Sequence, residues 1–172
     1  MIHCRQGKFN IMIMKKTAIF VDVQNVYYTT RQAFAGRFDY NAFWARVSEI
    51  SHVEIARAYA IASQDQKQRQ FHHILRGIGF DVQLKPFIQR SDGSAKGDWD
   101  VGIALDVFEM AQTVDHVVLV SGDGDFQILV ERIQQRFGTQ VTVVGVEQLT
   151  ANNLIDAADQ FIPIDSSLLI GG

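Results

Sequence analysis

The sequence predicts an α/β fold, a three-layer sandwich around a central, mostly parallel sheet. Short apolar runs alternate along the chain with helical patterns, and this alternation is typical of parallel sheets covered by helices. The run "HVVLVS" (116–121) is apolar almost throughout, as expected for a central strand buried on both faces. A chain of 172 residues without an internal repeat or a low-complexity segment is expected to form one domain.

Six runs are predicted as strands. The runs are 17–23 (TAIFVDV), 53–62 (VEIARAYAIA), 80–87 (FDVQLKPF), 116–121, 140–146 (QVTVVGV) and 161–164 (FIPI). The third is closed by Pro86, since proline lacks the N–H that a sheet ladder needs. Helices are predicted between these runs, at 40–50, 64–76, 99–112, 125–137 and 148–158. The fourth helix carries an apolar stripe at helical spacing and ends at Gly138.

Both ends of the chain are expected to lie outside the fold. We predict a loose extension over 1–14, the domain over 15–166 and a short tail over 167–172, and Met14 is an alternative start to Met1. The opening segment is too short and interrupted in its apolar part for a signal peptide. A single cysteine, Cys4, allows no internal disulfide, which fits a reducing cytoplasm. No run approaches the ~18 apolar residues of a membrane span, so no membrane association is expected.

Charge is distributed unevenly along the chain. Residues 1–96 carry 14 Lys/Arg and 7 Asp/Glu, whereas residues 97–172 carry 2 Lys/Arg and 12 Asp/Glu. This segregation fits an acidic cleft beside a basic surface, and it equally fits two solvated faces of unlike charge.

Acidic residues follow the predicted strands where a site would form. Asp22 ends the first strand, and Asp123 and Asp125 lie on the glycine-containing turn "SGDGDF" (121–126). Asp-Gly pairs are also ordinary turn chemistry, because glycine accepts a positive φ. Asp98 precedes the helix predicted at 99–112 and Asp100 lies in its first turn, where acids also cap helices and complement the helix dipole. If the first and fourth strands are neighbours, these carboxylates converge on one edge of the sheet.

Such a cluster indicates a metal site. Carboxylates that crowd together raise one another's pKa unless cations compensate, and hard oxygen ligands favour Mg²⁺ or Mn²⁺ over zinc. One or two such ions can activate water and stabilise the leaving oxygen in phosphodiester cleavage. His72 and His73 are adjacent and point in different directions on a helix, so we interpret them as surface or groove residues.

Three stretches together resemble the NYN domain, a branch of the PIN-like metal-dependent ribonucleases, and in particular its LabA-like members. The stretches are "FVDVQN" (20–25), "KGDWDVGIALD" (96–106) and "LVSGDGDF" (119–126), and the later "VTVVGVEQLTANNLIDAADQFIPID" (141–165) is similar to the group's closing strand–helix–strand. The resemblance covers about 17–165. It implies a PIN-like fold, an acidic centre holding Mg²⁺ or Mn²⁺, and RNA as substrate. It also implies the catalytic metal ligands, which are Asp22, Asp100, Asp123 and Asp125, with Asn25 beside them.

Four further residues are candidates for supporting roles. Lys96 is expected near the scissile phosphate or as a solvated loop lysine, and Asp98 as a ligand or the helix N-cap. Ser121 either bonds the acidic loop or only ends its strand. Asp106 follows Asp100 by six residues, about 240° around a helix, so both cannot face one ion closely.

The function predicted from these observations is a Mg²⁺- or Mn²⁺-dependent endoribonuclease. The alternatives are an RNA-binding or regulatory module that keeps the pocket without cutting, and a Toprim- or phosphatase-like phosphotransfer enzyme. A phosphatase would require a second carboxylate where this chain has Gln24. The expected partner is RNA, and a homodimer is left open. RNA is expected to cross Lys85, Arg90 and Lys96, although these are equally explained as scattered solvated charges.

Overall fold

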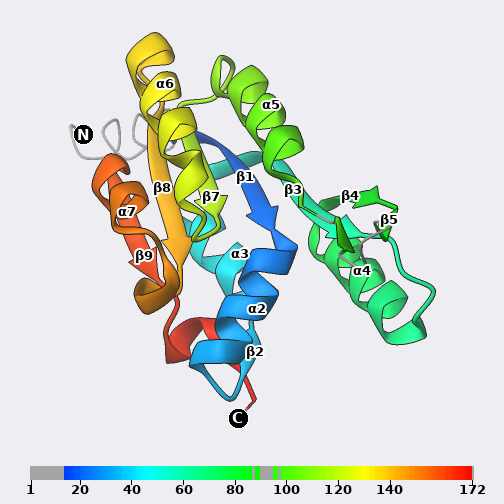
Figure 1. The fold of residues 1–172 in the computed structure, drawn as a ribbon. Coiled ribbons are helices and arrows are strands. Elements are labelled where there is room, and N and C mark those ends of the chain that lie inside the picture. Colours follow the sequence, from blue (N-terminus) through cyan, green and yellow to red (C-terminus); the bar gives the residue numbers. More distant parts are fainter. Residues whose placement is uncertain (1–13, 87, 90–94, 97, 172) are drawn as a thin grey trace, which may run out of the picture.

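The core of the protein is a six-stranded sheet in which every pair of neighbours is parallel (Figure 1). The computed structural model describes residues 14–86, 88–89, 95–96 and 98–171. In spatial order the strands are β4 (Asp81–Lys85), β3 (His52–Ile61), β1 (Lys16–Asp22), β7 (His116–Val120), β8 (Gln140–Gly145) and β9 (Gln160–Pro163). The predicted fold class is therefore confirmed, and each predicted strand overlaps one strand of the sheet.

Helices cover both faces of the sheet, which makes the three layers. One face packs against α2 (Val23–Ala33), α3 (Tyr40–Ile50) and α4 (Gln66–Ile78). The other packs against α5 (Asp100–Ala111), α6 (Gln127–Phe137) and α7 (Asn152–Ala157). Short 3₁₀ turns, Gly124–Phe126 and Glu147–Leu149, precede α6 and α7, in places where the sequence predicts the first turn of each helix.

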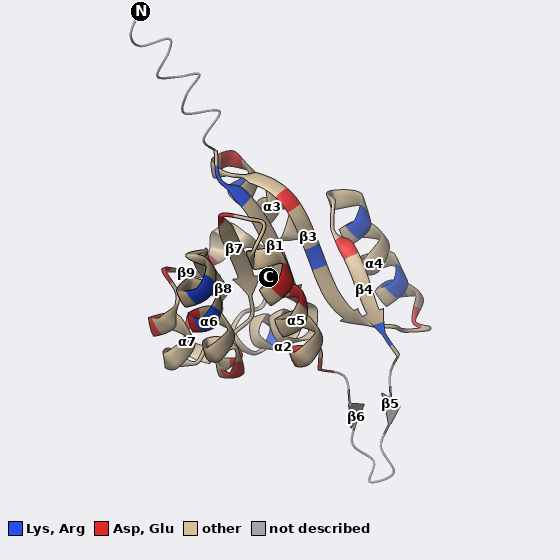
Figure 2. Ribbon diagram, turned by 90° about the horizontal axis from the view of Figure 1, so that it is seen from above, with Lys and Arg blue, Asp and Glu red and all other residues tan. Residues whose placement is uncertain are grey.

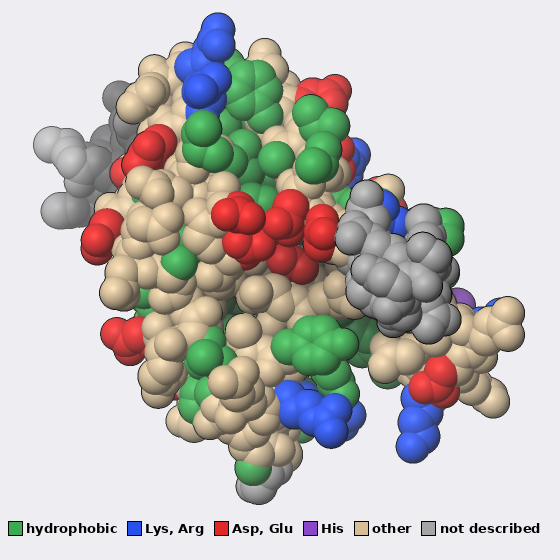
Figure 3. Space-filling model, viewed as in Figure 1, with side chains coloured by type: hydrophobic (Ala, Val, Ile, Leu, Met, Phe, Trp, Pro, Cys, Tyr) green, Lys and Arg blue, Asp and Glu red, His purple; other side chains and the backbone are tan. Residues whose placement is uncertain are grey.

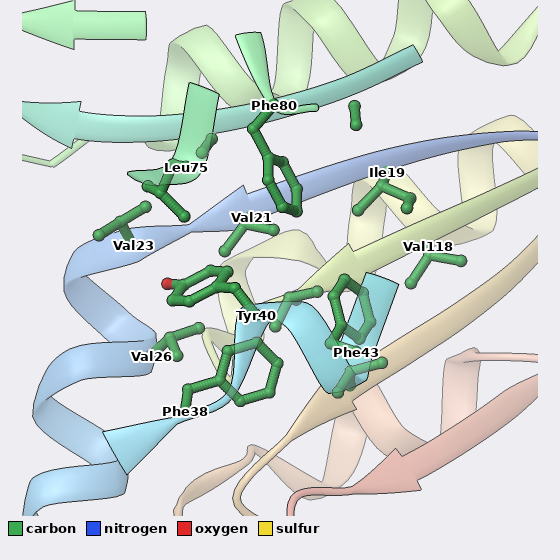
Figure 4. Packing of buried hydrophobic residues seen from close by; sticks show 14 of the residues in the cluster. Ile19, Val21, Val23, Val26, Phe38, Tyr40, Phe43, Leu75, Phe80 and Val118 are labelled. Carbon is green, nitrogen blue, oxygen red and sulfur yellow. The ribbon is translucent and has the colours of Figure 1, made fainter. Parts of the chain in front are cut away.

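Alternate residues of β1 supply both halves of the core. Ile19 and Val21 belong to the cluster beneath α2 to α4, and Ala18 and Phe20 belong to the cluster beneath α5 to α7. Figure 4 shows Ile19 and Val21 directed toward aromatic side chains such as Phe43. A strand buried on both faces has no polar side, which is why its sequence is a continuous apolar run.

Helix α2 is absent from the sequence prediction. Its sequence, VQNVYYTTRQA, contains β-branched and aromatic residues that lose side-chain freedom in a helix. The helix forms because Val23, Val26 and Thr30 are buried against the sheet, and the hydroxyl of Thr30 is satisfied there because it donates to the carbonyl of Val26 at 2.7 Å. Tertiary packing therefore overrides a weak local preference.

The end of the chain folds back onto the domain. Leu168 is buried in the core, and β10 (Leu169–Ile170) pairs with β2 (Arg37–Phe38) in a small antiparallel sheet. The segment expected as a short tail from residue 167 thus packs against the fold. Most of the extension predicted over 1–14 lies outside the described residues. Within the described ranges, no helix has the length and apolarity needed to cross a membrane.

The strand order creates a switch point between β1 and β7. From β1 the chain builds outward through β3 and β4, then returns to place β7 on the other side of β1. Val21 and Val120 are partners in the β1–β7 pairing, so both strands end at the same edge of the sheet. Open α/β sheets form their sites at such points.

Candidate metal centre

Asp22 lies at the carboxyl end of β1 and is buried, so it forms the floor of the site at this edge of the sheet. It is the N-cap of α2, where Asp22 Oδ1 accepts from the backbone N–H of Asn25 at 3.5 Å. The Ser121 hydroxyl donates to Asp22 Oδ2 at 3.1 Å. Burial raises the pKa of the Asp22 carboxyl, partly offset by these two hydrogen bonds, and the charges of Asp123 and Asp98 raise it further.

The loop after β7 is bonded to this floor and to itself. Ser121 Oγ accepts from the Asp123 N–H at 3.2 Å, and Asp123 Oδ1 accepts from the Asp125 N–H at 2.9 Å. The side-chain carbonyl of Asn25 accepts from the Gly122 N–H at 2.9 Å. Two predicted supporting residues, Ser121 and Asn25, therefore connect the carboxyl ends of β1 and β7.

The two glycines of this loop are needed for space. Neither has a positive φ, so the loop does not use the conformational freedom that turn chemistry assigns to glycine, whereas the bond from the Asp125 N–H to Asp123 is ordinary turn chemistry. A Cβ on Gly122 would lie 2.9 Å from the carbonyl oxygen of Leu149, and one on Gly124 would lie 2.8 Å from Ala151 Cβ. The acidic loop packs so closely against the segment before α7 that only glycine fits. Asn153 adds a bond from its amide to the Gly124 carbonyl at 3.3 Å.

Asp100 is positioned by Trp99, whose role the sequence did not reveal. The N-cap of α5 is Trp99 and not Asp98, although the Asp98 carboxylate accepts from the Asp100 N–H at 3.4 Å. The Trp99 indole donates to the carbonyl of Ala60 in β3 at 2.8 Å, which attaches the start of α5 to the sheet. A Cβ on Gly102 would lie 2.6 Å from the Trp99 ring, so glycine at position 102 leaves room for the indole over the first turn of α5.

Three of the four predicted ligands form one compact group. Asp100, Asp123 and Asp125 each offer a carboxylate oxygen, and these atoms lie within 4.8 Å of one another. Figure 3 shows acidic side chains gathered in one patch in the middle of this face. Burial, a side-chain hydrogen bond with Asp123 and that residue's charge raise the pKa of Asp100 to about 7. Asp22 is not a member of the group, but its charge contributes to the raised pKa of Asp100.

Asp106 and Lys85 make their contacts outside this group. Asp106 accepts from the Tyr59 hydroxyl at 2.7 Å and forms an ion pair with Arg57 at 3.1 Å. Both partners belong to β3, so the Asp106 carboxylate connects α5 to that strand. Lys85 donates to the backbone carbonyl of Asp98 at 3.0 Å, and its ammonium lies 5.1 Å from the centre of the Trp99 ring. Arg90 and the side chain of Lys96 lie outside the described residues.

The donor set fits a hard divalent cation. It consists of carboxylate oxygens, and within the described residues no Lys or Arg forms an ion pair with Asp100, Asp123 or Asp125. Without a compensating positive charge, a large share of Asp100 stays protonated near neutral pH, as its raised pKa indicates. A Mg²⁺ or Mn²⁺ ion would compensate the same charges, and oxygen ligands are those that these ions prefer.

The raised pKa of Asp100 predicts how the chelated protein responds to pH. Between about pH 4 and 7, Asp100 is protonated in the folded state and ionised in the unfolded state, so stability falls as pH rises. In chelator, we expect the melting temperature of the wild type to fall between pH 5 and 8 more steeply than that of Asp100→Asn. Mg²⁺ should stabilise the wild type more at pH 8 than at pH 5, because the ion competes with the proton. If the melting temperatures of the two proteins fall equally with pH, the assignment of the raised pKa to Asp100 is contradicted.

Comparison with known proteins identifies the family. The family model for the NYN domain matches residues 16–165, nearly all of the chain that the structure describes. The chain belongs to the NYN domain family. The PIN-like fold implied by the resemblance is thereby confirmed.

Two relatives extend this result. The NYN domain is 30% identical over 158 residues to Low amplitude and bright protein LabA from Synechococcus elongatus, covering 87% of this chain and 84% of that protein. It is 64% identical to a crystal structure of a protein of unknown function from Vibrio parahaemolyticus, with a TM-score of 0.88, covering 91% of this chain and 97% of the other. The resemblance to LabA-like members is confirmed, whereas the role of each aspartate stays a prediction.

Proposed function

We propose that this NYN domain is an endoribonuclease that depends on Mg²⁺ or Mn²⁺. The observation that carries the proposal is the convergence of Asp100, Asp123 and Asp125 at the β1–β7 switch point of a PIN-like fold. Capping explains one acid at a helix start, but it does not explain three carboxylates from two separate elements within 4.8 Å.

In this proposal, Asp100, Asp123 and Asp125 hold the ion, and Asp22 supports it from the buried floor. A divalent cation at such a centre lowers the pKa of water and neutralises charge on a phosphoryl group. The chain's own contribution is positioning. Ser121 and Asn25 hold the acidic loop on β1, and Trp99 holds Asp100 toward it. This arrangement presets the ligands before any substrate arrives.

The test is cleavage of a mixture of single-stranded and structured RNA in Mn²⁺, with excess chelator as the control. We expect internal cleavage in Mn²⁺ that the chelator removes. RNA binding without cleavage of any RNA would instead support the alternative, a catalytically silent RNA-binding or regulatory module with the same pocket. Cleavage that persists in chelator would contradict a metal-dependent enzyme.

RNA reaches the acidic centre, in this proposal, along the segment 85–96. An acidic centre repels a polyanion unless cations flank it. Figure 2 shows basic residues on α4 and at the end of β4, where the chain leads toward α5. Lys85 lies there, next to Trp99 and thus beside the residue that positions Asp100.

Replacing Lys85, Arg90 and Lys96 together with Ala should weaken RNA binding. The slope of log affinity against log salt should flatten by up to ~0.7 for each single-strand phosphate that the variant no longer neutralises. The matched control replaces Lys15, Lys16 and Arg136, which lie toward the opposite edge of the sheet, where β1 and β8 begin. If the two triple variants have the same affinity and the same salt slope, RNA does not follow the 85–96 segment.

A further inference from the structure

A cleft of about 910 Å³ opens between α2 and α4. It is lined by Val23 and Gln24, which directly follow Asp22, and by residues 60–64 at the carboxyl end of β3. The cleft therefore lies on the same edge of the sheet as the carboxylates. Its volume is in the range of pockets that hold small organic ligands, about 300–1,000 Å³.

Exposed aromatic rings form one wall of the cleft. Tyr27 and Tyr28 are 48% and 61% exposed, and their rings meet edge to face with centroids 5.4 Å apart. Phe71 from α4 lines the opposite side, half-buried against the core. Figure 3 shows hydrophobic and then basic side chains below the acidic patch, separated from it by a band of other atoms, over the position of α2. Tyrosines exposed to this degree contribute little to the core, and they present flat faces on which another ring can stack.

The wall of the cleft also contains a polar ring. His72 lines the cleft and is only 4% exposed. Burial and the charge of Arg76 lower the pKa of His72, so its ring is neutral near pH 7, with one donor and one acceptor. A neutral imidazole on the wall of a cleft can therefore both donate to a ligand and accept from it.

The remaining lining selects the kind of ligand. Gln24, Gln64 and Gln68 place amides around the cleft, and Arg37 and Lys67 add positive charge. Amides and a neutral imidazole can pair with the edge of a nucleobase, aromatic faces can stack on it, and cations can hold its phosphates. An apolar partner helix would leave these polar groups unpaired, so it fits the lining less well.

We propose that the cleft binds an unpaired base of the RNA strand whose phosphate lies at the acidic centre. This inference rests on the proposed function, because the strand is the same. The short path along α2, from Asp22 to Gln24 and then Tyr28, would connect the scissile phosphate with a base beside it. Since any base has a stacking face, Tyr28 contributes affinity for single-stranded RNA, and His72 is placed to read a base edge.

The test compares two labelled oligonucleotides of equal length, a single-stranded oligoribonucleotide and its abasic counterpart, in chelator so that binding is measured without cleavage. The wild type should prefer the base-bearing strand by about tenfold, a typical effect of one stacked base. Tyr28→Ala should bring this preference close to one, whereas Tyr28→Phe should retain it. Ile50→Ala, which alters a 70% exposed side chain near the start of β3, is the control and should behave as the wild type.

These results test the proposal for the cleft independently of the proposal that the protein is a nuclease. If Tyr28→Ala leaves the preference unchanged, or if the wild type has none, the cleft does not bind a base, whether or not Mn²⁺-dependent cleavage occurs. If the preference depends on Tyr28 and no RNA is cleaved, base binding in the cleft is supported and the nuclease proposal is contradicted. Free nucleoside monophosphates form a second arm. If they bind as tightly as the oligonucleotide, the ligand is a free nucleotide and the RNA strand is excluded.

Discussion

The variant Asp100→Asn is expected to lose RNA cleavage by at least about a hundredfold in Mn²⁺ while it keeps most of its RNA affinity. Replacing residues that merely orient metal ligands typically costs about 10–100-fold, so loss of a ligand itself should cost at least that much. Affinity for RNA depends chiefly on phosphate contacts with cations, and Asn removes none of these. The measurement is the single-turnover cleavage rate beside the dissociation constant.

The control for this variant is Glu109→Gln, an exposed acid in the same helix. It changes the charge by the same amount and should cleave like the wild type. Equal cleavage by Asp100→Asn and the wild type would indicate a contaminating nuclease or a centre elsewhere. A loss of cleavage together with an equal loss of binding would mean that Asp100 supports the RNA site and not the chemistry.

Mg²⁺ or Mn²⁺ is expected to raise the melting temperature of the wild type by about 5–10 °C at a concentration a hundred times the dissociation constant. An ion that binds only the folded state contributes about 2.7 kcal/mol under that condition. For a chain of this size, each kcal/mol shifts the melting temperature by roughly 2–4 °C. The double variant Asp22→Asn/Asp123→Asn should lose this shift, because it removes one carboxylate from the group and one from its floor.

The double variant should remain folded in chelator. Asn retains a side-chain oxygen that can accept from Ser121 and the Asn25 N–H, and charge repulsion among the acids becomes weaker. Glu109→Gln/Asp156→Asn removes the same charge at exposed positions and should show the full shift. An undiminished metal-dependent shift in Asp22→Asn/Asp123→Asn would rule out this pocket as the metal site.

The architecture, and the edge of the sheet at which the site forms, could be predicted from the amino-acid sequence. A strand buried on both faces must be apolar throughout, so runs such as 116–121 identify the strands of a parallel sheet. The helix predicted over 40–50 has the bounds that the structure gives α3, Tyr40–Ile50. Asp22 and Asp123 could be placed at strand ends for the same reason, because the pattern that defines a strand also shows where it stops.

The arrangement of the acids, and the side chains that hold them, depend on packing between distant segments. Asp100 meets Asp123 and Asp125 because Trp99 bonds to Ala60, 39 residues away, and no local pattern encodes that contact. Helix α2 forms against its weak propensity because the sheet buries one of its sides. The cleft likewise combines Tyr28 with His72, whose positions are unrelated in sequence. Local sequence determines which residues alternate between the inside and the outside of the fold, whereas contacts between distant segments are set by packing in three dimensions.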